Sequence, residues 1–169
     1  MGLMRRSDST SSSEAVHRIV IDSPVGRLAV DAVRDAITGV HFVDSDTLAG
    51  ESCELLEAAR AQLHEYFAGR RRTFDLPVSL AGCGEFQRRV LAEVAAIPFG
   101  MTESYGRIAA RVGRPQASRA VGQANGRNPI SLLIPCHRVI GSNGTLTGYG
   151  GGLPAKTWLL RHEGVLLPR

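Results

Sequence analysis

Three short stretches near the start of the chain alternate apolar with polar residues, at positions 17–22, 28–33 and 37–43. Such alternation is typical of β-strands with one buried face. Ser23-Pro24-Val25-Gly26 separates the first two stretches and Arg34-Asp35 the second two, and both sequences favour tight turns. The pattern therefore predicts an antiparallel β-meander.

Farther along, apolar residues recur every three or four positions, as they do on the buried face of an amphipathic helix. The predicted helices cover residues 51–67, 85–97, 104–112, 116–125 and 154–163. The third and fourth of them flank Gly113-Arg114-Pro115, an arrangement that resembles a helix-turn-helix. A continuous apolar run at 130–134 predicts a buried strand.

Composition divides the chain into three parts. Residues 1–15 are polar and serine-rich, which predicts a disordered tail. Residues 73–84 contain Pro77 and two glycines and predict an extended connection between domains. We therefore expect an α+β protein. Its N-terminal domain, over 16–82, has an antiparallel β-sheet and a helix, and its C-terminal domain, over 83–169, is mostly helical and winged-helix-like.

The net charge of +4 is unevenly distributed along the chain. Residues 1–84 carry nine arginines and twelve acidic residues, whereas residues 85–169 carry eleven basic and four acidic residues. A basic half favours a surface that faces a polyanion such as nucleic acid. A solvated surface with a chance asymmetry would give the same pattern, so charge alone leaves both interpretations open.

Neither a membrane span nor a secretory signal is expected. The chain has no apolar run long enough to cross a bilayer, and the leading MGLMRRSDSTSSS lacks an apolar segment after its arginines. We therefore expect a cytoplasmic protein. Its three cysteines, Cys53, Cys83 and Cys136, are widely spaced and form no C-x-x-C pair, which predicts free thiols and no metal site.

The helix predicted over 116–125 has small side chains along much of its surface, with Arg119 as the exception. Gly122 within it costs about 1 kcal/mol of helix stability relative to alanine, so another surface is expected to approach closely. That surface is either the core of the protein itself or a groove of DNA, and the helix alone does not decide between them.

Cys136 and His137 are adjacent on a loop that follows the predicted strand. An imidazole beside a thiol favours the thiolate, which is the reactive form of cysteine. A carboxylate that orients the imidazole would complete a triad. The C-terminal half offers four acidic residues, and Glu163 near the end of the last predicted helix is the candidate.

The segment Pro135-Cys136-His137-Arg138-Val139-Ile140 resembles the active-site motif of the O6-alkylguanine-DNA alkyltransferases. Further motifs of that family occur in the same order: SYGRIA at 104–109, SRAVG at 118–122, NP at 128–129, GYGGG at 148–152 and WLLRHEG at 158–164. The resemblance is dense over residues 85–164 and looser before them, at DSPVGRL and YFAGRRRTFDLPV. So many motifs in order are far more specific than any one of them.

The resemblance implies direct-reversal DNA repair by a suicidal methyltransferase. The alkyl group of O6-alkylguanine, and of O4-alkylthymine, would move once to Cys136 and inactivate the protein, without a cofactor. His137 would act as the base through a water and would be oriented by Glu163. Asn128 would support the active-site turn, and Tyr105 would favour base flipping and protonate guanine N3.

The resemblance also implies how the DNA is held. The main chain of Cys136 and Val139 would accept from the guanine amine, and Tyr149 and Gly150 would line the pocket. Arg119 would fill the stack position of the flipped base. Further DNA contacts are implied for Ser104, Ala117, Ser118, Ala120, Gly122 and Ser142. The implied partner is double-stranded DNA, bound through the minor groove with little sequence preference by a monomer that could cluster on DNA.

The chain departs from the pattern of the family in several places. Gly150 stands where many relatives carry a serine, so a side-chain hydrogen bond to O6 is missing and the backbone N–H would serve instead. Leu91 stands where bacterial relatives often carry tryptophan. The N-terminal half shows no metal-binding spacing. The cysteine-rich sensing module of some relatives is absent, which argues against a transcriptional regulator.

Two other functions remain open at this point. Alkyltransferase-like proteins bind the lesion without repairing it, but they lack the acceptor cysteine that Cys136 supplies here. A cysteine hydrolase would use the same Cys–His pair, but it needs an oxyanion hole and water access to an acyl-enzyme. The protein mass after incubation with an alkylated oligonucleotide would separate the three.

Overall fold

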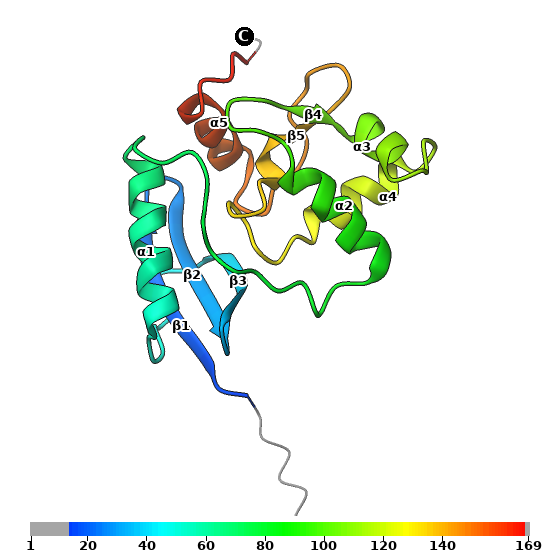
Figure 1. The fold of residues 1–169 in the computed structure, drawn as a ribbon. Helices are drawn as coiled ribbons and strands as arrows, with labels where there is room; N and C mark the ends of the chain where they lie inside the picture. Colours follow the sequence, from blue (N-terminus) through cyan, green and yellow to red (C-terminus); the bar gives the residue numbers. More distant parts are fainter. Residues whose placement is uncertain (1–13, 168–169) are drawn as a thin grey trace, which may run out of the picture.

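The computed structural model describes residues 14–167, in which two parts lie side by side (Figure 1). One part is a three-stranded sheet with a single helix, and the other contains four α-helices and two very short strands. The mixed α+β class predicted from the sequence is confirmed. Of the tail predicted over residues 1–15, residues 1–13 lie outside the described range.

The N-terminal sheet is antiparallel, with its strands in the order of the sequence. The strands are β1 (Val16–Ser23), β2 (Gly26–Val33) and β3 (Ala36–Val43). Ile19 pairs with Val30, which pairs with Val40, so that buried apolar side chains form a row across the sheet. A shift by one residue would turn this row to water, which is why the pattern specifies the register. The predicted meander is confirmed.

Helix α1 (Glu54–Phe67) packs against all three strands. It begins later than the sequence predicts because the residues before it pair with the outer edge of β1. The Arg18 N–H donates to the Glu51 carbonyl, and the Gly50 N–H donates to the Arg18 carbonyl, each at 3.0 Å. Backbone groups that would be left open at a sheet edge are thereby satisfied.

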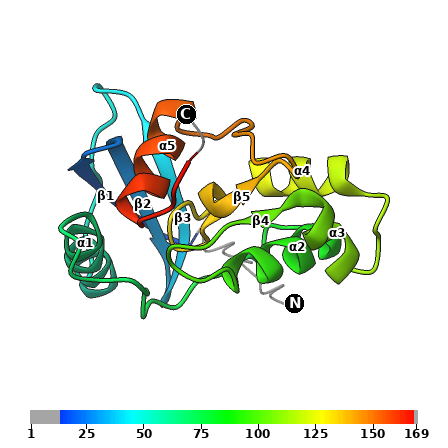
Figure 2. The same cartoon turned by 90° about the horizontal axis from the view of Figure 1, so that it is seen from above.

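The opposite edge of the sheet, formed by β3, is covered by two segments of the chain. The Ile37 N–H donates to the Pro77 carbonyl at 2.8 Å. The Val40 N–H donates to the Pro129 carbonyl at 2.9 Å, and the Val40 carbonyl accepts from Ser131 at 3.2 Å. In both views β3 is the strand nearest to the C-terminal part (Figures 1 and 2).

The C-terminal part places two short helices against a longer one. Its elements are α2 (Glu85–Ala95), β4 (Glu103–Ser104), α3 (Tyr105–Arg111), α4 (Ser118–Gly126), β5 (Val139–Ile140) and α5 (Leu153–His162). Helices α3 and α4 pack against each other and against α2. Gly113 in the turn between them has φ +76°, a conformation that favours glycine. The predicted helix–turn–helix arrangement is therefore present.

The prediction of a strand over residues 130–134 is wrong, because this segment forms a turn. The segment is largely buried, yet it forms only isolated bridges. The chain turns back on itself, with the Ile134 N–H donating to the Ile130 carbonyl at 3.0 Å and with Leu132 in the left-handed region at φ 71°. Periodicity cannot distinguish a strand from a buried turn in so short an apolar run.

Candidate active site

Cys136 lies on the 3₁₀ helix η1 (Cys136–Arg138), at the end of the buried turn. It is 5% exposed, and the neighbouring His137 is fully buried. Glu163 directly follows α5, and its carboxylate Oε1 lies 2.8 Å from Nε2 of His137. The fold thus brings the predicted carboxylate into contact with the histidine that adjoins the cysteine.

The Glu163 carboxylate is the centre of a buried hydrogen-bond network. Arg138 donates from Nε to Oε2 at 2.8 Å and from Nη2 to Oε1 at 3.0 Å, and the Tyr66 hydroxyl donates to Oε1 at 2.7 Å. The Gly100 N–H donates to Oε2 at 3.3 Å. Burial alone would raise the pKa of Glu163, but the hydrogen bonds with His137, Arg138 and Tyr66 outweigh it and hold the pKa below its ordinary range. Glu163 is therefore ionised at neutral pH.

The His137 imidazole is neutral in these surroundings. Burial lowers its pKa, and the opposing effect of Glu163 is smaller. With the Nε2–H donating to the carboxylate, Nδ1 is left as an unprotonated acceptor. It is buried and has no hydrogen-bond partner in the described part of the chain. This nitrogen is free to take up a proton.

The Cys136 thiol is protonated at rest. Burial raises its pKa, while the side chains of Asn128 and Ser131 and the charge of Lys156 lower it by less. A thiolate is needed for attack on carbon, so the reaction requires a proton acceptor. The unprotonated Nδ1 of His137 meets that need chemically.

Two asparagines fix the backbone that presents the thiol. The Asn128 amide donates to the Ile134 carbonyl at 2.8 Å, and its Oδ1 accepts from the Ile130 N–H at 3.0 Å. These bonds hold the turn before the cysteine. Asn125 donates to the carbonyl of Cys136 itself at 3.3 Å.

Lys156, a buried residue of α5, joins two segments that follow the cysteine. Its Nζ donates to the Val139 carbonyl at 2.6 Å and to the Thr147 carbonyl at 3.1 Å. Burial lowers the pKa of Lys156 to about 8. The Val139 carbonyl, expected to accept from the guanine amine, is thus already bound to an amine, and one lone pair remains for a second donor.

Four polar residues of this network were not predicted from the sequence: Tyr66, Asn125, Arg138 and Lys156. For two of them the sequence contained a feature that could have pointed to the site. Arg138 adjoins the proposed base within an apolar segment, and Lys156 is the sole lysine of the chain. Tyr66 had no such feature, because an aromatic residue on the apolar face of a helix is usually a core residue.

An open cavity of about 540 Å³ lies between α3, α4 and the loop after β5. Its lining residues are Tyr105, Ser118, Arg119, Gly122, Gln123, Gly126, Thr147 and Gly148. The Tyr105 hydroxyl lies 2.7 Å from Oγ1 of Thr147, and a Cβ added to Gly122 would lie 3.7 Å from the Tyr105 ring. The cavity therefore gathers four of the predicted site residues.

The surface of α4 separates into two faces. Val121, Ala124 and Asn125 are buried, whereas Ser118, Arg119 and Ala120 are exposed. The small side chains of the exposed face are thus open to a partner. The other predicted contact residues are Ser104 and Ala117, which are half-buried, and Ser142, which is exposed.

Tyr149 and Gly150 lie on the glycine-rich loop before α5. The Tyr149 ring centroid is 6.4 Å from that of His137. The Tyr149 hydroxyl is buried without a hydrogen-bond partner among residues 14–167, and burial raises its pKa. Gly150 is exposed, and no described atom lies within 4 Å of where its Cβ would be. Tyr149 therefore borders the buried centre, and Gly150 faces solvent.

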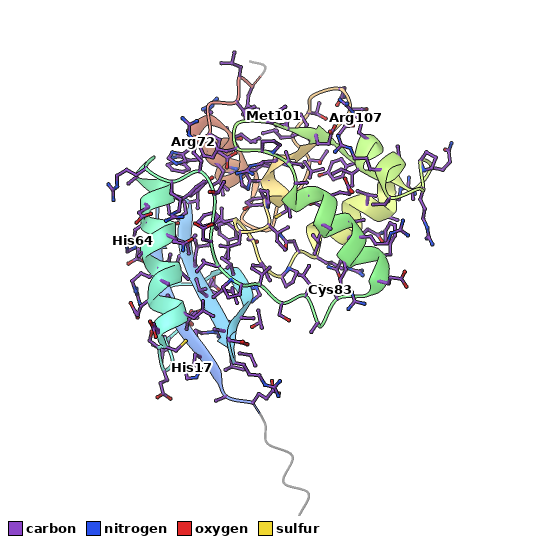
Figure 3. All side chains as sticks on the ribbon, in the orientation of Figure 1. His17, His64, Arg72, Cys83, Met101 and Arg107 are labelled. Carbon is purple, nitrogen blue, oxygen red and sulfur yellow. The ribbon has the colours of Figure 1, made fainter. Side chains whose placement is uncertain are left out.

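The other two cysteines lie outside this network. Cys53 directly precedes α1, and Cys83 lies in the connection before α2; both are half-buried. Figure 3 shows His17 and His64 at different places on the N-terminal part and Cys83 apart from both, near the start of α2. Over residues 14–167 no three histidine, cysteine or acidic side chains gather as metal ligands. In that range no helix combines the length and apolar character needed to cross a membrane.

Comparison with known proteins matches both parts of the chain to one family. Residues 85–165 match the DNA binding domain of 6-O-methylguanine DNA methyltransferase, and residues 16–80 match its ribonuclease-like domain. A methylated-DNA–protein-cysteine methyltransferase of Mycolicibacterium paratuberculosis is 47% identical over 148 residues, which cover 85% of this chain and 89% of the relative. One of Salmonella typhimurium is 57% identical over 106 residues, which cover 63% of this chain and 62% of the relative.

A solved structure is similar over most of the molecule. OGT of Mycobacterium tuberculosis, in complex with DNA, superimposes with a TM-score of 0.80 at 44% identity, over 87% of this chain and 92% of that chain. The chain therefore belongs to the 6-O-methylguanine DNA methyltransferase family and is an enzyme of direct-reversal DNA repair, which binds damaged DNA and transfers an alkyl group to a protein cysteine.

Proposed function

We propose that Cys136 accepts the alkyl group of O6-alkylguanine in duplex DNA. The observation that carries this proposal is the buried contact of His137 Nε2 with Glu163 Oε1, which leaves Nδ1 unprotonated on the residue next to Cys136. Cys53 and Cys83 lie away from this pair, so they lack the same proton acceptor.

The proposed reaction is a displacement at the alkyl carbon. The thiol proton moves to His137, directly or through a water, while sulfur forms a bond to the alkyl carbon and the bond from that carbon to O6 breaks. Glu163 stabilises the imidazolium that results. The electron pair of the broken bond stays on guanine, which leaves more readily once it has gained a proton.

Tyr105 is the proposed donor of that proton, to guanine N3. Its hydroxyl lies in the 540 Å³ cavity, where it contacts Thr147. A base flipped out of the duplex would enter here and take the place of Thr147 beside the Tyr105 hydroxyl. The Val139 carbonyl, the Tyr149 ring and the Gly150 N–H would complete the base pocket, and Asn128 would keep the turn before the cysteine in place.

Each molecule would act once. A thioether has no good leaving group, so the alkyl group stays on sulfur and the protein is inactivated. O4-alkylthymine carries the same kind of bond, between an alkyl carbon and an exocyclic oxygen of the base, and it is the second proposed substrate. We place the reaction in the cytoplasm, where thiols remain reduced.

The proposed DNA surface is the exposed face of α4, with Arg119 at its centre. Small side chains allow a helix to approach the minor groove closely, and Arg119 would occupy the stack position of the flipped base. Because phosphate contacts supply much of the affinity, binding should weaken steeply with salt and depend little on sequence. The protein would bind as a monomer that can cluster along DNA.

The direct test is the mass of the protein after reaction. Incubation with a duplex that carries one O6-methylguanine should add one methyl group per molecule, in proportion to the lesion, and peptide mapping should place it on Cys136. A methyl group on Cys53 or Cys83, or several lesions repaired by one molecule, would contradict the proposal. An unchanged mass would favour lesion binding without transfer.

Arg119→Ala should slow repair of duplex DNA by about tenfold, which corresponds to about 1.4 kcal/mol. Without the side chain, the flipped base returns to its stack more easily, whereas free O6-benzylguanine needs no flipping. Rates on both substrates check this. Arg161→Ala, which removes an exposed charge on α5, is the matched control. If Arg119→Ala slowed the reaction equally with the duplex and with free O6-benzylguanine, Arg119 would have no role in holding the base flipped.

A further inference from the structure

Phe42, near the end of β3, reaches from the N-terminal sheet to the glycine-rich loop that precedes α5 and contains Tyr149 and Gly151. Its ring packs against the Tyr149 ring edge to face, with centroids 5.5 Å apart and planes at 78°. A Cβ added to Gly151 would lie 2.5 Å from the Cζ atom of Phe42, closer than side-chain carbons approach one another. Phe42 therefore occupies the space that a side chain at position 151 would need.

Strand β3 contacts the chain on both sides of Cys136. Val40 bonds through its backbone to Pro129 and Ser131, in the segment before the cysteine. Two residues later, Phe42 contacts the loop after it. The strand thus contacts both the turn that precedes the thiol and the loop that carries Tyr149, in keeping with its position beside the C-terminal part (Figures 1 and 2).

Packing, rather than a hydrogen bond, holds the Tyr149 ring in place. Its buried hydroxyl has no bonded partner within the described residues. The rings that contact it are those of Phe42 and His137, at centroid distances of 5.5 and 6.4 Å. Without the Phe42 ring, Tyr149 would be free to move toward the sheet and away from His137.

We infer that Phe42 is a positioning residue that limits the size of the alkyl group transferred to Cys136. It does not touch the substrate; it fixes Tyr149, whose ring centroid lies 6.4 Å from that of His137, the residue next to Cys136. The inference rests on the proposed function and deepens it. On this inference the N-terminal sheet contributes to substrate selectivity. It would discriminate between lesions in which alkyl groups of different volume are bound to the same base oxygen.

Phe42→Ala tests this through a ratio of rates. The rate constants for transfer from O6-methylguanine and O6-benzylguanine would be measured in one duplex sequence. The ratio of benzyl to methyl should rise by about tenfold, the scale on which one changed contact in an apolar pocket alters discrimination. Phe42→Leu, which keeps most of the volume, should give a smaller rise. An unchanged ratio with both rates lowered would show a structural role alone and overturn the inference.

A second measurement tests the contact itself and does not depend on the stability of one variant. Gly151→Ala should slow transfer, because the new Cβ meets the Phe42 ring. In the double variant with Phe42→Ala the rate should recover. Gly82→Ala, in the connection before α2, is the matched control, since a Cβ there meets no described atom, and its effect should be the same in both backgrounds. Equal effects of Gly151→Ala in both backgrounds would contradict the contact.

The two levels of the argument fail separately. If the wild-type protein gains no alkyl group on Cys136 from either substrate, the proposed function is wrong. If it reacts with both and the ratio does not respond to position 42, only the role of Phe42 is wrong.

Discussion

Replacing Cys136 by serine should abolish alkyl transfer while duplex DNA is still bound. A hydroxyl loses its proton far less readily than a thiol, and its oxygen is a poorer nucleophile toward saturated carbon. Loss of the nucleophile should lower the rate by at least about 10⁴-fold, as in other enzymes that react through one side chain. Intact mass after incubation with the methylated duplex measures the loss, and fluorescence anisotropy measures binding.

The controls for this result are the other two cysteines. Cys53→Ser and Cys83→Ser should each gain one methyl group at the wild-type rate, since both residues lie outside the buried network. Binding by Cys136→Ser should be near that of the wild type, because the proposed DNA surface is the face of α4. Methyl transfer to Cys136→Ser protein would show that another residue is the acceptor.

Glu163→Gln should destabilise the protein by about 3–5 kcal/mol, the cost of leaving a buried charge without its partner. Arg138 donates two hydrogen bonds to this carboxylate, and it is buried. An amide of the same shape keeps the volume but removes the charge, and its NH₂ group would face other donors. Transfer should also slow by about 10²-fold, because the His137 imidazolium would lose its stabilising charge.

Urea unfolding at neutral pH and single-turnover kinetics would measure the two effects of Glu163→Gln. Glu57→Gln is the matched control, since this exposed carboxylate pairs with Arg60 at the surface, at 3.1 Å, where solvent screens the interaction, and its loss should change stability little. If both variants unfolded at the same urea concentration, the buried network would not be a source of stability.

The same substitution should change how stability responds to acid. The pKa of Glu163 in the folded protein lies below its ordinary value of about 4.3, so its ionisation stabilises the fold above that pH, and the contribution is lost as the pH falls. In the Glu163→Gln protein, stability should fall less steeply with acid, because this carboxylate is no longer there to be protonated. Asp31, whose pKa is lowered to about 2 because the hydrogen bonds from Arg18 and His41 outweigh its burial, should still contribute to the loss in both proteins.

The elements that local pattern specifies were predicted well from the sequence. The three strands of the sheet and the helix of Glu54–Phe67 follow the alternation and the helical spacing of apolar residues, because these patterns reflect one buried face. The prediction of a strand at 130–134 was wrong because these apolar residues are buried in a turn. No periodicity could report that the turn depends on the side chain of Asn128.

Residues of the candidate site could be predicted only where they belong to the family motif or are neighbours in the sequence. Cys136 and His137 are neighbours, and Glu163 was one of four acidic residues in its half. The contacts of Tyr66, Lys156 and Phe42 join elements that are distant in the sequence, and they depend on how the sheet and the helices meet. Residue types alone do not reveal such contacts, since each of these residues has an ordinary structural role as its default.

The order in which the chain is synthesised gives the network around Glu163 a further meaning. Tyr66 and Glu163 are 97 residues apart, and the carboxylate follows Cys136 in the chain. Because chains fold progressively from the N-terminus as they leave the ribosome, the thiol emerges before the group that orients its base. The arrangement of Cys136, His137 and Glu163 is therefore completed only once the whole C-terminal part has been synthesised. Orientation of His137 is therefore among the last steps of folding, because it requires the end of α5 to pack beside Tyr66 of the N-terminal part.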